Sequence, residues 1–313
     1  MVKAPLLLFS VATVAVAGCH RAALSTGPRA VAPSPLAADI DTLASPAFSG
    51  RAAGTHGADS AADFLARRYY HLGLRAAFES ECMPASRCAT SYLQMIRLPD
   101  VVYHNVGAIV DGLDSARRGE YVVIGAHFDH LGHSPSLALD RSAGFVLRPG
   151  ADDNASGTAA VLELARRFAD RPAKRSILFV NFDAEEQGLV GSRALLITPP
   201  VSKTAICFML NFDMIGRMRG DRLFVDSRSM EPAVRAVFDS SAKTVGIRAQ
   251  FVPNEGHSDD ASFADEGIVA AGLSTGLHAD YHKASDVPTR LNITGLRRVV
   301  DLAESVVRRM ADR

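Results

Sequence analysis

The sequence has no excess of either charge, and this absence argues against one broad class of function. Its 313 residues carry 34 Lys and Arg against 34 Asp and Glu, so the formal net charge is zero. We therefore expect no nucleic-acid partner, because nucleic-acid binding normally leaves a basic excess on one face. Internal repeats and heptad arrays are also absent, and the 4 cysteines are not spaced as zinc ligands. The 48% of hydrophobic residues is enough for one large core or two small ones.

Long apolar runs are lacking as well, apart from a short one near the N-terminus. No run after residue 19 approaches the roughly 18 residues that a membrane span needs. Residues 1–18 instead have the pattern of a signal peptide, with Lys3 before an apolar stretch at 6–17. The stretch ends in Val-Ala-Gly-Cys at 16–19, which resembles the bacterial lipobox.

This resemblance implies that Cys19 carries a lipid anchor to a membrane surface. Residues 19–36 then form the lipidated cysteine and a flexible tether, followed by a single domain at 37–313. We expect the protein in a bacterial cell envelope, facing the periplasm from the outer membrane, or secreted. In such an oxidising compartment Cys82 and Cys88 could pair, and the sequence leaves this open. It also leaves the oligomeric state open.

Apolar runs and amphipathic stretches alternate along the rest of the chain. Buried strands are predicted at 105–110, 121–126, 176–182, 204–212 and 268–273, and helices at 58–72, 155–168, 230–245 and 295–310. This alternation predicts an α/β fold: a three-layer αβα sandwich with a mostly parallel, mixed central sheet. Ligands of such sheets bind beyond the carboxyl ends of the strands.

Metal-type ligands follow three of these predicted strands. The strand at 121–126 is followed by His127, the strand at 176–182 by Asp183, Glu185 and Glu186, and the strand at 204–212 by Asp213. Asp152 and Asp153 precede a predicted helix. Each group alone suits a solvated turn or a helix cap. Carboxylates that converge at one sheet edge repel one another, however, and bound divalent cations remove that conflict. Together the groups predict a metal site.

Five segments carry a resemblance to a known family. They are GAHFDHLG at 125–132, GADDNASG at 150–157, FDAEEQG at 182–188, NFDM at 211–214 and YHKASD at 281–286. In this order they resemble the M28 family of di-zinc peptidases, over roughly residue 40 to the C-terminus. The resemblance implies the zinc-exopeptidase fold and two divalent metal ions. Zinc suits the imidazole and carboxylate ligands, and cobalt or manganese would also be accepted.

The resemblance also implies a role for each matched residue. His127, Asp153 and Asp213 would hold one metal ion, and Asp153, Glu186 and His282 the other, with Asp153 bridging. The peptide bond between Asp153 and Asn154 would be cis. Glu185 would be the general base that takes a proton from the attacking water.

Side chains around these ligands are assigned supporting roles. Asp129 is expected to accept from the second ring nitrogen of His127, and Asp286 to do the same for His282. His130 is expected beside the metal ligands rather than among them, and His278 is the less favoured candidate for the last ligand. Residues 134–149 are longer than a minimal connection and form either a rim of the cleft or a surface loop.

The resemblance implies an aminopeptidase that acts on peptides with a free N-terminus, and three alternatives remain. A carboxypeptidase or dipeptidase would need a cation for the terminal carboxylate, for which Arg141, Arg148 and Arg217 are candidates. A glutaminyl-cyclase-like transferase would use one zinc ion. A non-catalytic binding protein would keep the fold alone, although such proteins usually lose ligands and all five positions are filled here.

Overall fold

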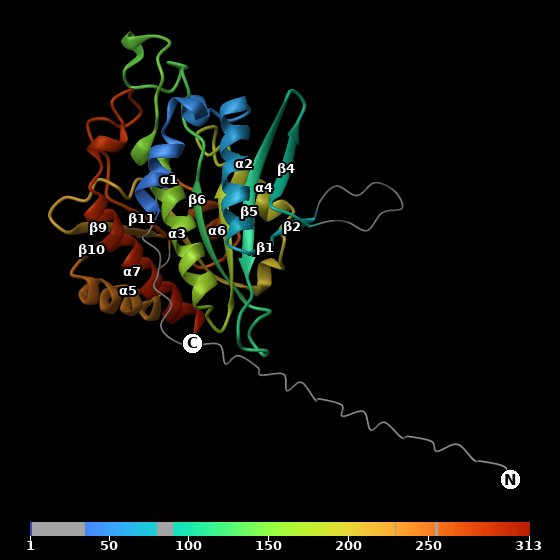
Figure 1. Cartoon of the computed structure of the whole chain (residues 1–313). Helices are drawn as coiled ribbons and strands as arrows, with labels where there is room; N and C mark the ends of the chain where they lie inside the picture. Colours follow the sequence, from blue (N-terminus) through green and yellow to red (C-terminus); the bar gives the residue numbers. More distant parts are fainter. Residues whose placement is uncertain (2–34, 80–89, 229, 254–255) are drawn as a thin grey trace. The chain divides into compact units, whose positions relative to one another are not determined.

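A computed structural model of the chain describes Met1 and residues 35–79, 90–228, 230–253 and 256–313 (Figure 1). The predicted signal peptide, Cys19, almost the whole tether and the Cys82–Cys88 pair lie outside the described residues and stay predictions. Residues Ser34–Arg313 form one compact unit. In the described part of the chain, no helix combines the length and the apolar character needed to cross a bilayer.

A mixed sheet of 9 strands forms the middle of this unit. Its core is the parallel run β7 (Ser176–Phe182), β6 (Tyr121–His127), β8 (Ile206–Phe212) and β11 (Ala270–Ser274). On one side β5 (Val101–Val110) pairs antiparallel with β7, and it also pairs with β1 (Arg75–Ala76) and β4 (Leu93–Leu98). On the other side β9 (Arg222–Ser227) runs antiparallel to β11 and parallel to β10 (Arg248–Pro253). A separate pair joins β2 (Phe78–Glu79) and β3 (Thr90–Ser91).

Helices cover both faces of the sheet (Figure 1). One core contains the inward side chains of α1 (Leu36–Leu43), α2 (His56–His71), α3 (Gly157–Asp170), α5 (Pro232–Val245) and α7 (Ile293–Ala311). The opposite core contains side chains of α4 (Val190–Ile197) and α6 (Asp260–Asp265). Alternate residues of β6 point into the two cores, Ile124 into the first and Val123 into the second. The predicted three-layer αβα sandwich is confirmed.

Sequence signals explain where the elements begin and end. The 7 residues of β7 are all buried, as its largely apolar sequence predicts, and the polar Ser176 and Asn181 are buried with the rest. Helix α7 begins where the side chain of Asn292 accepts from the Gly295 N–H. Helix α5 ends at Gly246, whose φ of 71° suits glycine. The central strands therefore present their carboxyl ends together at one edge.

Candidate metal centre and pocket

Three parallel strands bring the predicted ligands to one place. His127 is the last residue of β6 and lies opposite Phe182, the last residue of β7. Glu185 and Glu186 follow in the turn after β7, and Asp213 follows β8 directly. Asp153 enters from the segment before α3, and its peptide bond to Asn154 is cis, as the resemblance implied.

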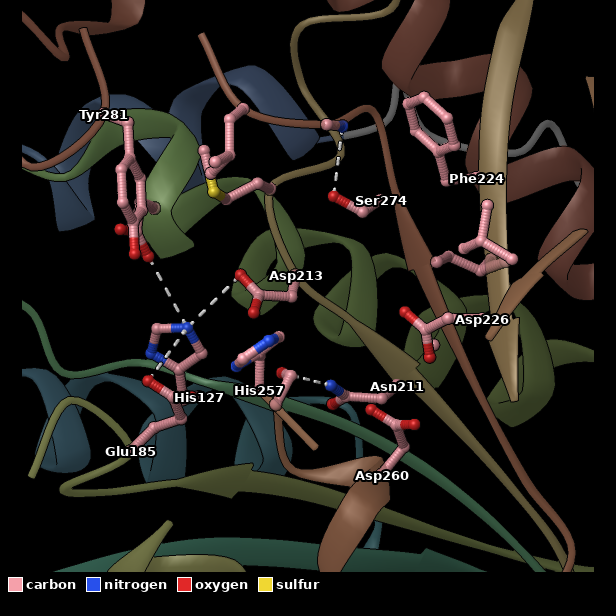
Figure 2. A pocket seen from close by; sticks show the side chains of 18 of the residues that line it. His127, Glu185, Asn211, Asp213, Phe224, Asp226, His257, Asp260, Ser274 and Tyr281 are labelled. Atoms are coloured by element: carbon pink, nitrogen blue, oxygen red, sulfur yellow. Dashed lines mark hydrogen bonds and ion pairs between the residues drawn. The ribbon is translucent and has the colours of Figure 1, made fainter. Parts of the chain in front are cut away.

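The first group of ligands surrounds the Nε2 atom of His127. This atom lies 3.6 Å from Asp153 Oδ1, 3.5 Å from Asp213 Oδ1 and 3.9 Å from Glu185 Oε2 (Figure 2). His127 is only 1% exposed. Two ligand atoms bound to one tetrahedral zinc ion at about 2.0 Å lie about 3.3 Å apart. The separations around His127 therefore suit a shared cation better than direct hydrogen bonds.

The second group surrounds the other oxygen of Asp153. His282 Nε2 lies 3.2 Å from Asp153 Oδ2 and 3.1 Å from Glu186 Oε2. His130 Nδ1 donates to Glu186 Oε1 at 3.0 Å and lies 3.7 Å from Asp153 Oδ2. Asp153 Oδ2 is buried and accepts no hydrogen bond of good geometry within the described residues. These donor atoms fit a second cation, and both His130 and His282 lie within its reach.

The electrostatics of both groups show how strongly negative charge is concentrated. Burial would lower the pKa of His127, but Glu185, Asp129 and Asp213 outweigh burial and raise it well above its usual value. Burial also lowers the pKa of His282, and Asp153 and Glu186 together raise it to about 10. Carboxylates that hold imidazoles in this way favour divalent cations at the same place.

Asp129 lies beside His127, as predicted, and its carboxylate also contacts the turn that carries Glu185 and Glu186. Its Oδ1 is 3.5 Å from His127 Nδ1, while the backbone oxygen of Asp129 is nearer at 3.2 Å. The carboxylate accepts the backbone N–H groups of Glu185 at 3.0 Å and Glu186 at 3.3 Å. Asp129 therefore fixes the turn that carries both glutamates.

The prediction for Asp286 is wrong in the structure. Its carboxylate accepts from the backbone N–H groups of Asp152 and Asp153 and forms no hydrogen bond or ion pair with His282 in the described part of the chain. His282 Nδ1 donates instead to the backbone oxygen of Leu137 at 3.0 Å. His278 pairs with Asp152 Oδ2 at 3.1 Å, away from the two ligand groups.

Residues 134–149 pack on the segment that carries His282. This packing explains why His282 has Leu137 rather than Asp286 as its partner. The Leu139 N–H donates to the backbone oxygen of His282 at 3.0 Å, and Asp140 Oδ2 accepts from the Ala284 N–H at 2.8 Å. Arg148 is completely buried and donates to Asp140 Oδ1 at 2.7 Å. Sequence reasoning missed the contacts with His282 and Ala284, because their partners lie about 140 residues earlier in the chain.

A pocket of about 540 Å³ opens beside the ligands. It extends from His127 and Asp153 across β8, β11 and β9 to the segment before α6. Its apolar lining includes Val252, Leu273 and Phe224, the last of which is labelled in Figure 2. Several acids line it, but among the described lining residues there is no Lys or Arg.

Comparisons with known proteins identify a family and a fold. Residues 105–307 match the sequence profile described as Peptidase family M28. A "Probable zinc metalloprotease" of Leptosphaeria maculans is 34% identical over 233 residues, which cover 72% of this chain and 50% of the relative. The alignments cover 66% and 50% of the first two curated relatives, so the chain spans about half to two thirds of their length.

Solved structures show the same fold at low identity. A zinc aminopeptidase from Bacillus subtilis superposes with a TM-score of 0.71 at 17% identity, covering 89% of this chain and 95% of that one. A glutaminyl cyclase of Bacteroides thetaiotaomicron, bound to N-acetylhistamine, gives a TM-score of 0.70 at 17% identity, covering 87% and 96%. Because this fold occurs with both named activities, the choice between them depends on the residues of the site.

Proposed function

Since the chain belongs to peptidase family M28, we propose that it is an aminopeptidase that uses two divalent metal ions, zinc by preference, to remove N-terminal residues from peptides. The observation that supports this proposal most strongly is that two groups of candidate metal ligands share Asp153 and lie beside an acidic pocket.

The ligands divide into two sets in this proposal. His127, Asp153 and Asp213 would hold one ion, and Asp153, Glu186 and His282 would hold the other. His130 orients Glu186 through the 3.0 Å hydrogen bond to Oε1, which leaves Oε2 beside His282. A pair of divalent ions in these two positions would supply Lewis-acid chemistry, namely a lowered pKa of bound water and polarisation of the scissile carbonyl.

Glu185 is the general base. Its carboxylate lies 3.9 Å from His127 Nε2 and its side chain is 11% exposed, so it borders both the ligands and the pocket. Burial raises the pKa of Glu185 well above its ordinary value; His127 opposes this shift, and Asp213 and Asp259 add to it. A carboxylate of raised pKa accepts a proton from water and returns it to the leaving amine more readily near neutral pH. Asp129 holds the Glu185 backbone for this task.

The charge of the pocket favours a free amine over a free carboxylate. A carboxypeptidase needs an available cation, yet Arg148 is fully buried against Asp140 and backbone oxygens. Arg217 pairs with Asp280 at 2.7 Å, and the exposed Arg141 does not line the pocket. The acids around the pocket would repel a terminal carboxylate and attract an ammonium group.

The test compares aminoacyl nitroanilides with their N-acetylated forms, using the full chain and a Glu185→Gln variant. We expect turnover of the free-amine substrates alone, two metal ions per chain, and a loss of about 10²–10⁴-fold in kcat with metal content retained in the variant. Glu266→Gln is the control, because Glu266 is exposed and pairs with Lys203.

Two results would contradict the proposal. Cleavage of acetylated substrates only would exclude an aminopeptidase. One metal ion per chain, with cyclisation of N-terminal glutamine in place of hydrolysis, would favour the cyclase.

A further inference from the structure

The floor of the pocket carries three acceptor side chains around a glycine. In the sheet, Gly272 of β11 lies opposite Asn211 of β8 on one side and Asp226 of β9 on the other. A Cβ at Gly272 would lie 2.6 Å from Asp226 Oδ1, so the carboxylate folds over this glycine. Figure 2 shows Asp226 and Asp260 turned toward each other beside Asn211.

Asp260 brings a second carboxyl group to the floor from the first residue of α6. It is 1% exposed, and Asp226 is half-buried. Burial and the neighbouring Asp226 together raise the pKa of Asp260 well above its usual value. Two facing carboxyl groups hold a proton between them when no cation is present, and a cation can replace that proton.

Asn211 gives an independent indication of a ligand. Its Nδ2 donates to Ser258 Oγ at 2.8 Å, which fixes the direction of the amide. Its Oδ1 is buried and accepts no hydrogen bond within the described part of the chain. Buried acceptors without a donor are rare in folded proteins, so this oxygen is suited to a donor that arrives with a ligand.

The walls above this floor are apolar. Phe224 and Val252 line the pocket from β9 and β10, and Leu273 lines it from β11. An aliphatic stem can lie against these side chains while its charged end reaches the acceptors. No Lys or Arg stands among the described residues that line this pocket.

We infer that this part of the pocket binds the side chain of the substrate's N-terminal residue and selects a basic one, arginine or lysine. The aliphatic stem contacts Phe224 and Val252, and the guanidinium or ammonium group donates to Asp226, Asp260 and Asn211 Oδ1. The inference rests on the proposed aminopeptidase activity and adds its substrate class.

The test measures kcat/KM of the full chain for nitroanilides of arginine, lysine, norleucine, leucine and glutamate. Norleucine is the matched control for lysine, because it keeps the stem and lacks the charge. We expect arginine and lysine to exceed norleucine by about 10–100-fold, the range expected for hydrogen bonds to a charged group. Glutamate is expected to be the poorest substrate.

Asp226→Asn is the first variant because its side chain is only half-buried, whereas Asp260→Asn could disturb the packing of α6. We expect it to lower kcat/KM for arginine and lysine by about 10–100-fold and to leave norleucine within about 3-fold. Asp239→Asn is the control, since Asp239 is exposed on α5.

Each outcome discriminates. A preference for apolar residues, or an Asp226→Asn effect equal on all substrates, overturns the basic specificity while the aminopeptidase proposal stands. If the wild type cleaves no free-amine substrate, the proposed function fails, and the inference fails with it.

Discussion

Arg51 is the side chain whose replacement we expect to destabilise the protein most. It is fully buried, and its guanidinium donates to four backbone oxygens: those of Leu43 at 2.6 Å, Phe128 at 2.7 Å, and Pro149 and Gly150 at 2.8 Å. These oxygens belong to the end of α1 and to the segments that carry His127 and Asp153. Burial lowers the pKa of Arg51 to about 10, opposed by Asp129 and Asp153, so the side chain stays charged at neutral pH.

The size of the effect follows from these four bonds. Hydrogen bonds to a charged group contribute about 1.5–3 kcal/mol each, but removing the guanidinium also removes the cost of burying its charge. We therefore expect Arg51→Met to lower the free energy of unfolding by about 3–5 kcal/mol. Arg51→Lys keeps the charge but not the fork of donors, and it should lose most of the same energy.

The assay is guanidinium chloride unfolding followed by far-UV circular dichroism, with metal removed by a chelator so that ligand binding does not contribute. Arg75→Met is the matched control, because Arg75 is 47% exposed and pairs with the exposed Asp111. Its expected cost is below about 1 kcal/mol. If both variants unfold at the same denaturant concentration, Arg51 does not stabilise the segments around the site and the reasoning is refuted.

Two further predictions concern acid stability and the second metal position. Burial acts to raise the pKa of Glu163, but Arg166 and Arg167 outweigh it and hold this pKa below its usual value. The ion pairs of Glu163 with Arg166 and Arg167 therefore contribute stability above about pH 4.5, and this stability is lost as the pH falls through the folded-state pKa of Glu163. Glu163→Gln should cost about 1–3 kcal/mol in urea unfolding at pH 7 and less at pH 3, and an equal cost at both pH values would contradict this. Asp140→Ala removes the acceptor of the Ala284 N–H and the partner of Arg148, so it should weaken one of the two proposed zinc sites by about 10–100-fold in chelator competition. Leu139→Ala removes a 63% exposed side chain and keeps the backbone contact with His282, so it should leave the zinc affinity unchanged.

The strands, and the convergence of the side chains proposed as metal ligands, could be predicted because their signals are local. The bounds of β7 were predicted as observed, since its run of apolar residues gives way after Phe182 to the charged residues that start at Asp183. The ends of parallel strands share one edge of a sheet, which is why residues as distant as His127 and Asp213 could be expected near each other.

Contacts between distant loops left no such signal. The ring Nδ1 of His282 donates to the backbone oxygen of Leu137. Because every residue type has such an oxygen, the sequence does not identify this partner. The contacts by which Arg51 joins three segments could not be predicted from the sequence either, because the acceptors are again backbone oxygens. Asp286 suggested a histidine partner by its sequence position, whereas the fold turns its carboxylate toward the N–H groups of Asp152 and Asp153.

The geometry of the sheet also separates the proposed chemistry from the proposed selection. Of the proposed ligands, His127 ends β6 and Asp213 follows β8, and the proposed base Glu185 follows β7. Asp226 belongs to β9, on the antiparallel side of β11. A substitution at Asp226 can therefore change the charge of the pocket without altering a strand that carries a metal ligand. This separation is the reason why the Asp226→Asn variant can distinguish a change of substrate preference from a loss of catalysis.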